Sequence, residues 1–219
     1  MFPPFVEMPF TYTICLLVII SSFIGFYNKR YYQNLVYHPY EVFRGKRLHT
    51  ILTSGFVHQK WWHLFFNLYI FYRVNRDIEY IIMEDDFSFS IIVLICILLV
   101  IIGVVLPNLI DGLKHKNNIS YTSVGFSGAV FCSAGFCGLY LPLDELLKRH
   151  LLFPFLHHYY EVAFFGLAVF FTMALVFKNS KTANHSLHFN ALAIGCLLAV
   201  VLRPKLILEI IVHIKDRLD

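Results

Sequence analysis

The sequence has little charge. Only 15% of its 219 residues are Asp, Glu, Lys or Arg, whereas 58% are hydrophobic. Because a soluble domain carries about a quarter charged residues, this deficit excludes a disordered chain, a nucleic-acid-binding module and most soluble enzymes. The net charge of +4 requires no polyanionic partner. The composition predicts a protein that crosses the lipid bilayer several times and binds no nucleic acid.

Paired cysteines and metal-binding motifs are also absent from the sequence. The five cysteines lie in apolar runs and none belongs to a Cys-x-x-Cys pair. An odd set of this kind does not describe a disulfide framework, and small packing residues are the simpler interpretation. No His-Glu-x-x-His signature occurs. We therefore expect no metal and no other cofactor. The alternative is a zinc site formed by some of four histidines: His58, His63, His185 and His188.

Apolar segments set the expected fold. A spanning helix needs about 20 mostly apolar residues, and the sequence predicts six spans: Phe10–Tyr27, Trp61–Ile82, Phe87–Leu109, Gly125–Leu141, Tyr159–Phe177 and Leu187–Leu202. Residues 28–60 interleave tyrosines with basic residues, which is typical of a structured loop at the membrane interface. Residues 206–219 repeat isoleucines at helical spacing and predict an interfacial tail. The fold class is therefore an all-α polytopic membrane protein, with residues 1–219 forming a single six-helix domain.

The fourth apolar segment is too short to cross a bilayer. About 16 residues rise only ~24 Å along a helix, less than the ~30 Å hydrocarbon core. Pro142 marks its end, so the helix is expected to begin inside the membrane, with Ser127 in its first turn. Free N–H groups and the helix dipole favour negative charge there, and a serine can act as a nucleophile if a base reaches it. The alternative is that Ser127 and Gly128 are packing residues.

Two polar residues in the second segment could stabilise the negative charge that forms when a serine attacks a carbonyl group. His63 and Asn67 are spaced i,i+4 and share one helix face. Two donors on one face can hold an oxyanion. The alternative is that they form an interhelical hydrogen bond.

The last segment carries a histidine at the head of a stripe of small residues. The stripe consists of His188, Ala191, Gly195 and Ala199, and the short segment has its own stripe of Gly128, Cys132 and Gly135. Small stripes let helices approach closely. If the two stripes meet, His188 comes close enough to Ser127 to take its proton. No acidic residue is near His188 in sequence, which favours a dyad over a triad, and His185 is expected to lie on the surface of the preceding loop.

In this order the motifs resemble those of the rhomboid intramembrane serine proteases. The matching blocks are residues 52–67 with the pattern His-x4-His-x3-Asn, Gly125-Phe126-Ser127-Gly128, and His188 with Ala191 and Gly195. The resemblance covers residues 47–203. It implies a six-helix bundle with a short central fourth helix and a pocket open to the extracytoplasmic side. It also implies hydrolysis of peptide bonds in or near the transmembrane segments of other membrane proteins.

The same resemblance implies a role for individual residues. Ser127 matches the nucleophile and His188 the general base, while His63, Asn67 and the Ser127 N–H match the oxyanion donors. Structural positions of the motif are matched by His58, Glu79, Gly125, Gly128, Phe131, Ala191 and Gly195, with Phe131 placed to stack on the catalytic imidazole. The fifth span and the loop Lys178–Ser186 match a lateral gate and a cap.

Some features depart from the family pattern or leave alternatives open. Asn75 and Arg76 stand where a glycine is common, and Ala191 replaces a frequent glycine, which puts rate and stability in question. A catalytically inactive rhomboid-like protein that binds membrane clients is one alternative, and a small transporter is another.

The distribution of basic residues predicts the orientation in the membrane. With the first loop set aside, eight Lys and Arg residues lie on the side of the two termini and four on the opposite side, which favours cytoplasmic termini. We expect a multi-pass protein of a bacterial inner membrane.

Overall fold

The computed structural model describes residues 4–85, 87–143, 156–177 and 184–217. Within these residues the fold is all-α, and outside the helices the chain makes one isolated antiparallel bridge, between Tyr37 and Ser123. The six longer helices are α1 (Pro9–Tyr27), α5 (Trp61–Asp85), α6 (Phe89–His115), α7 (Ser127–Tyr140), α8 (Tyr159–Val176) and α9 (His185–Leu202). The shorter elements are η1 (Phe5–Glu7), α2 (Lys29–Leu35), α3 (Pro39–Val42), α4 (Thr50–Thr53), η2 (Ser54–Phe56) and α10 (Leu206–Asp216).

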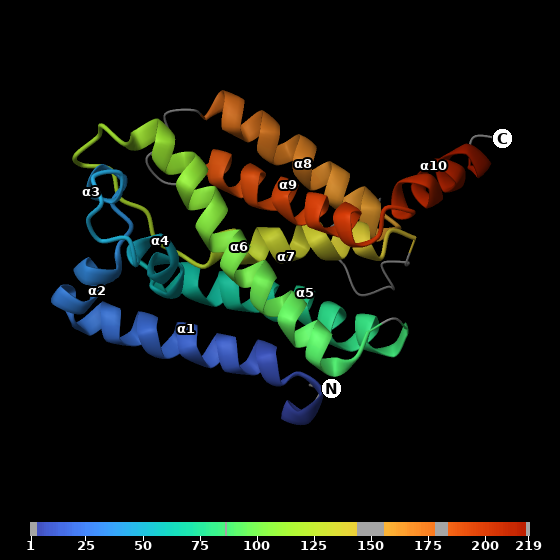
Figure 1. Ribbon diagram of the computed structural model, residues 1–219, viewed down its shortest axis with the longest axis horizontal. Helices are drawn as coiled ribbons and strands as arrows, with labels where there is room; N and C mark the ends of the chain where they lie inside the picture. Colours follow the sequence, from blue (N-terminus) through green and yellow to red (C-terminus); the bar gives the residue numbers. More distant parts are fainter. Residues whose placement is uncertain (1–3, 86, 144–155, 178–183, 218–219) are drawn as a thin grey trace.

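The six longer helices form an antiparallel bundle in which each reverses the direction of the one before (Figure 1). The start of α1 and the helix α10 lie toward the end opposite α2 and α3. Each longer helix coincides with one of the six predicted segments, so the predicted fold class is confirmed. The short fourth helix is also present, since α7 has only 14 residues.

Two of the helix boundaries that differ from the prediction do so because polar side chains find partners within the fold. α6 continues from Leu109 to His115, since Asp111 is buried and accepts a hydrogen bond from Tyr121 instead of facing lipid. α9 begins at His185, two residues earlier than expected, because the side chain of Asn184 caps it. The expectation that His185 lies in a surface loop is therefore wrong: it is partly buried in the first turn of α9.

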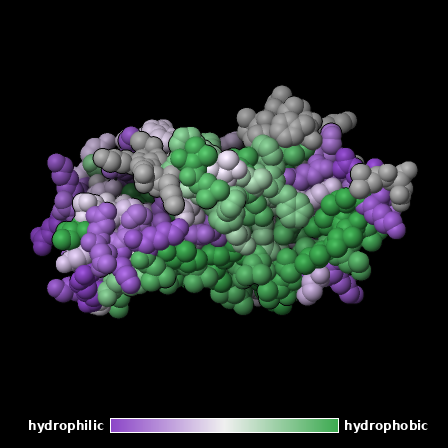
Figure 2. All heavy atoms as spheres, turned by 90° about the horizontal axis from the view of Figure 1, so that it is seen from above, coloured by the Kyte–Doolittle hydropathy of each residue, from purple (hydrophilic) through white to green (hydrophobic). Residues whose placement is uncertain are grey.

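The surface of the bundle suits a lipid environment. Four helices of the described residues are long and apolar enough to cross a membrane, namely α1, α6, α8 and α9, and α7 is a shorter apolar helix. The remaining long helix, α5, carries Arg73, Arg76, Asp77 and Glu79 in its second half. Figure 2 shows a broad apolar band between two hydrophilic ends. These features identify an integral membrane protein.

The helix α7 forms the centre of the bundle, where it contacts α5, α6, α8 and α9. All but two of its residues are buried. Gly128 packs directly on the backbone of α6, because a Cβ atom at Gly128 would collide with the Gly103 carbonyl oxygen. Small residues on several faces therefore allow the neighbouring helices to approach α7 closely.

A buried carboxylate fastens α1 to α5. Glu79 accepts hydrogen bonds from the backbone N–H groups of Phe10, at 3.1 Å, and Thr11, at 2.9 Å. The Thr11 hydroxyl also donates to this carboxylate. The first N–H groups of a helix have no intrahelical partner, and Met8, at the N-cap of α1, supplies no side-chain acceptor. Glu79 therefore caps α1 from a neighbouring helix.

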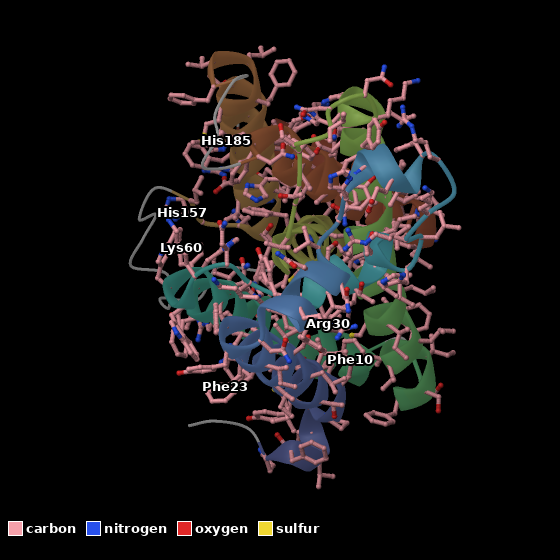
Figure 3. The ribbon with its side chains drawn as sticks, turned by 90° about the vertical axis from the view of Figure 1, so that its left-hand side faces the viewer. Phe10, Phe23, Arg30, Lys60, His157 and His185 are labelled. Carbon is pink, nitrogen blue, oxygen red and sulfur yellow. The ribbon has the colours of Figure 1, made fainter. Side chains whose placement is uncertain are left out.

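Residues 28–60 are structured. Arg47 bridges the turns of this segment through Glu41, at 3.0 Å, and the Val36 carbonyl, at 3.2 Å. The bridge from Tyr37 to Ser123 then ties the segment to the stretch that leads into α7. Figure 3 looks onto this end of the molecule, with Arg30 and Lys60 labelled. That this segment lies at a membrane interface stays a prediction.

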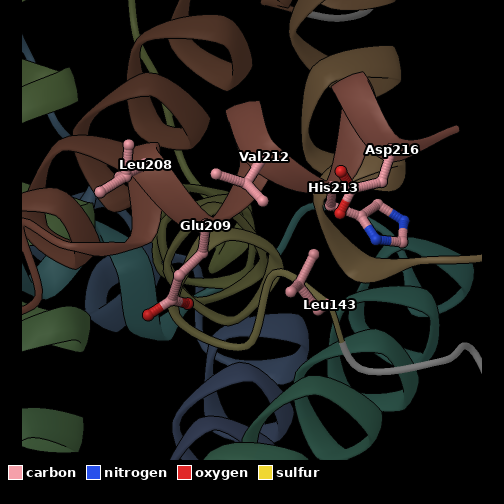
Figure 4. A pocket seen from close by; sticks show the side chains of 6 residues that line it. All are labelled: Leu143, Leu208, Glu209, Val212, His213 and Asp216. Atoms are coloured by element: carbon pink, nitrogen blue, oxygen red, sulfur yellow. The ribbon is translucent and has the colours of Figure 1, made fainter. Parts of the chain in front are cut away.

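The C-terminal helix α10 lies at the opposite end and is held by ion pairs. Arg203 contacts Glu209 at 2.9 Å, and Arg217 contacts Glu161 of α8 at 2.6 Å. A pocket of about 350 Å³ opens beside α10 (Figure 4), lined by Leu143, Leu208, Glu209, Val212, His213 and Asp216. None of these residues belongs to the predicted site.

Candidate active site

Ser127 and His188 lie in contact at the heart of the bundle. The Nε2 atom of His188 is 3.1 Å from the Oγ atom of Ser127, although 61 positions separate the residues in the chain. Ser127 is the first residue of α7 and is only 6% exposed. In Figure 1, α7 begins inside the bundle, recessed from the end that carries α2 and α3. Among the described residues no carboxylate is hydrogen-bonded to His188, so the contact joins two residues and not three.

Close packing of α7 on α9 produces this contact. A Cβ atom at Gly195 would collide with the Cys132 carbonyl oxygen, and one at Gly135 would collide with the Leu192 carbonyl oxygen. The two backbones therefore touch where both helices have glycine. The two small stripes meet along most of their length, but Gly128 faces α6 instead of α9. Ala191 is fully buried on the α9 stripe.

Two aromatic rings cover the imidazole of His188. Phe131 lies one turn after Ser127, and its ring centroid is 4.6 Å from that of His188 at an interplanar angle of 33°. Phe170 of α8 contacts both, with its ring edge-on to Phe131 at 4.6 Å and to His188 at 5.7 Å. Nothing in the sequence pattern singled out Phe170, because it is one of many aromatic residues in an apolar helix. The rings pack against the imidazole from α7 and α8 and restrict its orientation.

Gly125 places the backbone just before Ser127. Its φ of +121° lies in a region that side chains rarely allow, and its N–H donates to the Ser54 carbonyl at 3.0 Å. A Cβ atom at this position would be 3.0 Å from Cε1 of His63. Glycine is therefore required twice, for the turn and for the close approach of the His63 ring.

His58 connects the predicted oxyanion residues to the start of α7. Its Nε2 atom accepts a hydrogen bond from the Phe126 N–H at 3.2 Å and lies 3.0 Å from Nδ2 of Asn67. Because a backbone N–H can only donate, Nε2 carries no proton. Nδ1 therefore holds the proton and donates to Ser22 Oγ at 2.9 Å, and Ser22 donates to the Phe56 carbonyl at 3.2 Å. The sequence pattern had not indicated Ser22.

Burial keeps the His58 imidazole neutral. The residue is fully buried and precedes α5, outside the spanning helices. Burial, with a smaller contribution from nearby His63, lowers the pKa of His58 to about 3. The unprotonated Nε2 of a neutral ring has one lone pair, which the Phe126 N–H and the Asn67 amide share; a protonated ring has none to offer.

Other predicted residues lie away from this contact. Glu79 caps α1, as described above, and does not face Ser127. Asn75 is buried and donates to the Phe71 carbonyl at 3.2 Å, while Arg76 pairs with Asp77 at 3.0 Å. Asp77 also accepts a hydrogen bond from Tyr159 of α8 at 2.7 Å, a contact between distant helices that the sequence did not indicate.

The histidines considered as zinc ligands do not form a metal site among the described residues. In the part of the chain that the structure describes, no three His, Cys, Asp or Glu side chains converge as metal ligands would. His58 and His63 face each other with ring centroids 5.2 Å apart. Residues 178–183 of the expected cap lie outside the described residues.

A comparison with known protein families shows which family this chain belongs to. The family model for the rhomboid domain matches residues 45–205, about three quarters of the sequence. The chain belongs to the rhomboid family. No curated protein matches it. Because rhomboid proteins include both serine proteases and inactive members, membership of the family does not by itself assign an activity to this rhomboid.

Proposed function

We propose that this rhomboid is an intramembrane serine endopeptidase that hydrolyses peptide bonds in or near the transmembrane segments of other membrane proteins. The observation that carries the proposal is the 3.1 Å contact between Ser127 Oγ and His188 Nε2. An inactive member has no need of a buried hydroxyl and an imidazole in hydrogen-bond contact. The partners of the protein are then its transmembrane substrates and the lipid bilayer, with no metal or other cofactor.

The first step forms an acyl-enzyme. Ser127 Oγ attacks the carbonyl carbon of the scissile bond while His188 Nε2 takes the hydroxyl proton. His188 then donates this proton to the leaving amine as the peptide C–N bond breaks. Phe131 and Phe170 hold the imidazole in line with Ser127 during both transfers.

The charge that develops on the carbonyl oxygen needs donors beside Ser127. Because Val130 makes the first intrahelical bond, to the Phe126 carbonyl at 3.1 Å, the N–H of Ser127 has no acceptor within the helix. Asn67 directs one of its two amide hydrogens to His58, which leaves the other for the oxyanion. His63, beside Gly125, supplies a third donor from Nε2 or Nδ1.

The second step hydrolyses the ester. A water molecule transfers a proton to His188 and attacks the acyl carbon, after which Ser127 recovers its proton from His188. A helical substrate must unwind locally, because its carbonyl groups are already hydrogen-bonded. We expect residues of low helix propensity near the cut.

We also propose that both termini face the cytoplasm of a bacterium and that the Ser127 end faces away from it. The charge bias outside residues 28–60 supports this orientation. A reporter enzyme that is active only outside the cytoplasm, fused after residue 219, should be inactive. An active fusion would reverse the orientation.

The proposed activity is tested with purified protein in detergent and a panel of single-span substrates. Wild type should cleave at least one substrate, and Ser127→Ala should cleave none while keeping the same helical circular dichroism spectrum. A fluorophosphonate probe should label wild type and not Ser127→Ala. Client binding without labelling or cleavage would favour the inactive alternative, and ion flux that survives Ser127→Ala would favour a transporter.

A further inference from the structure

We propose that Tyr121 is a positioning residue for His188, because it joins the cap of α9 to a buried carboxylate of α6. The inference rests on the proposed function, since it assigns Tyr121 to the reaction of Ser127 and His188. Tyr121 lies in the stretch between α6 and α7, away from the two reacting atoms.

Asn184 sets where α9 begins. Its side-chain oxygen accepts from the Leu187 N–H at 3.0 Å, and its carbonyl oxygen accepts from the His188 N–H at 3.2 Å. The residue that caps the helix is thus bonded directly to the backbone of His188. A shift or rotation of Asn184 is passed to the His188 backbone through this first turn.

Tyr121 holds Asn184 in place. The amide nitrogen of Asn184 donates to the Tyr121 hydroxyl oxygen at 2.8 Å, and this hydroxyl donates to Asp111 Oδ2. Asp111 is 1% exposed within α6, so it is a fixed anchor. Burial and the adjacent Asp111 carboxylate raise the pKa of Tyr121 above its usual range, which keeps the donating proton in place.

Neighbouring contacts hold this chain of hydrogen bonds together. The Tyr121 ring stacks on His115 with centroids 3.8 Å apart and an angle of 3°. Lys114 donates to Ser186 Oγ at 2.5 Å, a second bond between the end of α6 and the first turn of α9. The tyrosine is therefore fixed by its ring and bridges α6 to α9 by its hydroxyl.

The stretch that contains Tyr121 also leads to the nucleophile. Two residues further on, Ser123 pairs with Tyr37 through N–H···O bonds of 3.1 Å in both directions. Gly125 then bonds to Ser54, and Ser127 follows. Tyr121 is thus connected to His188 through Asn184 and to Ser127 along the backbone. Loss of its hydroxyl should disturb their alignment, and proton transfer depends steeply on alignment.

The test uses full-length protein with three substitutions. Tyr121→Phe keeps the ring on His115 and removes both hydroxyl bonds. Asp111→Asn keeps an oxygen acceptor for the Tyr121 hydroxyl. Tyr27→Phe removes a hydroxyl from an exposed tyrosine at the end of α1 and serves as the matched control.

The first readout is the rate of fluorophosphonate labelling compared with its end point. We expect Tyr121→Phe to label to the same final stoichiometry as wild type but about tenfold more slowly, with kcat reduced similarly and KM within twofold. Tyr27→Phe should stay within threefold of wild type, whereas Asp111→Asn, which keeps an acceptor but removes the charge, should fall between wild type and Tyr121→Phe. A purely structural role would lower the end point and leave the rate per folded molecule unchanged, and that result would overturn the inference.

The second readout does not depend on activity. Amide hydrogen exchange of peptides covering residues 185–190 should be faster in Tyr121→Phe than in wild type and unchanged in Tyr27→Phe. If wild type is not labelled at all, the proposed function fails and hydrogen exchange alone decides whether Tyr121 holds the start of α9. Unchanged exchange in Tyr121→Phe would overturn the inference in either case.

Discussion

Gly195 of α9 lies directly on the Cys132 carbonyl of α7, with no space for a Cβ atom between the two backbones. This backbone contact lies two turns along α9 from His188, on the same stripe of small residues. It explains how an imidazole on one helix reaches a hydroxyl at the start of another. The proposed catalysis therefore depends on the close packing of α7 and α9 as much as on the reacting groups.

Substituting these packing glycines should destabilise the bundle. Gly195→Ala and Gly135→Ala each place a methyl group against a backbone carbonyl, and overpacking of this kind costs about 1–3 kcal/mol. Gly25→Ala is the matched control, because its Cβ would meet side-chain atoms only at 3.6 Å or more. Thermal unfolding followed by circular dichroism in detergent should show a lower Tm for the first two variants alone. Equal Tm values for all three would contradict the close contact.

Removing the base should stop catalysis without unfolding the protein. We expect His188→Ala to lower kcat by about 10³-fold or more, because the Ser127 proton then has no acceptor. The double variant Ser127→Ala/His188→Ala should be no slower than the slower single variant, since residues that act as a unit are not additive. Cleavage rates of one substrate measure both effects. A His188→Ala protein that cleaves at the wild-type rate would assign the base elsewhere.

The oxyanion donors should affect turnover more than binding. Asn67→Ala and His63→Ala are each expected to reduce kcat by about 10²–10³-fold with little change in KM, because the oxyanion exists only along the reaction path. Gln59→Ala, an exposed polar side chain just before α5, is the control and should retain wild-type kcat. An increase in KM alone would instead place Asn67 and His63 in substrate binding.

Acid should destabilise the protein in a way that depends on His58. Its folded-state pKa of about 3 is below the ordinary value of 6.5, so below pH 6.5 the unfolded chain binds a proton that the folded chain does not. Its stabilising contribution is fully present above pH 6.5 and is lost as the pH falls toward 3, by about 1.4 kcal/mol per pH unit.

The variant His58→Gln isolates this contribution, since glutamine can accept from Phe126 and does not titrate in this range. The decrease in Tm between pH 7.5 and pH 4.5 should be smaller for His58→Gln than for wild type. Identical decreases would show that His58 is not a neutral buried ring.

Much of the fold could be predicted from the sequence because lipid imposes simple rules. A backbone in hydrocarbon must satisfy its own polar groups, so long apolar runs have to be helices, and all six were predicted close to their ends. The short run from Gly125 to Leu141 was predicted to start within the membrane from its length and from Pro142, which marks its end. Its neighbour α6 ends six residues beyond the prediction, because a helix can continue through Asp111 once Tyr121 satisfies the carboxylate.

The site was indicated by residue types that are costly inside a membrane and by their places at the ends of apolar segments. His63 and Asn67 were singled out because polar groups at depth need partners or a function, Ser127 because it begins a short apolar segment, and His188 because it heads a stripe of small residues. Their catalytic roles stay predictions. The sequence could not indicate Phe170, Ser22 or Tyr121, because an aromatic residue or a serine is common in such segments.

What the sequence determined by itself was the set of helices and the few polar residues within them, since both follow from the local cost of burying polar groups in lipid. Only the tertiary structure decided which of these groups meet. The contact of His188 with Ser127 requires backbones that touch at Gly135 and Gly195, a neutral His58 that holds Asn67 and Phe126, and an α9 that begins at Asn184. Such contacts join residues far apart in the chain, and the stripes of small residues predicted the one between His188 and Ser127 only on condition that their helices pack together.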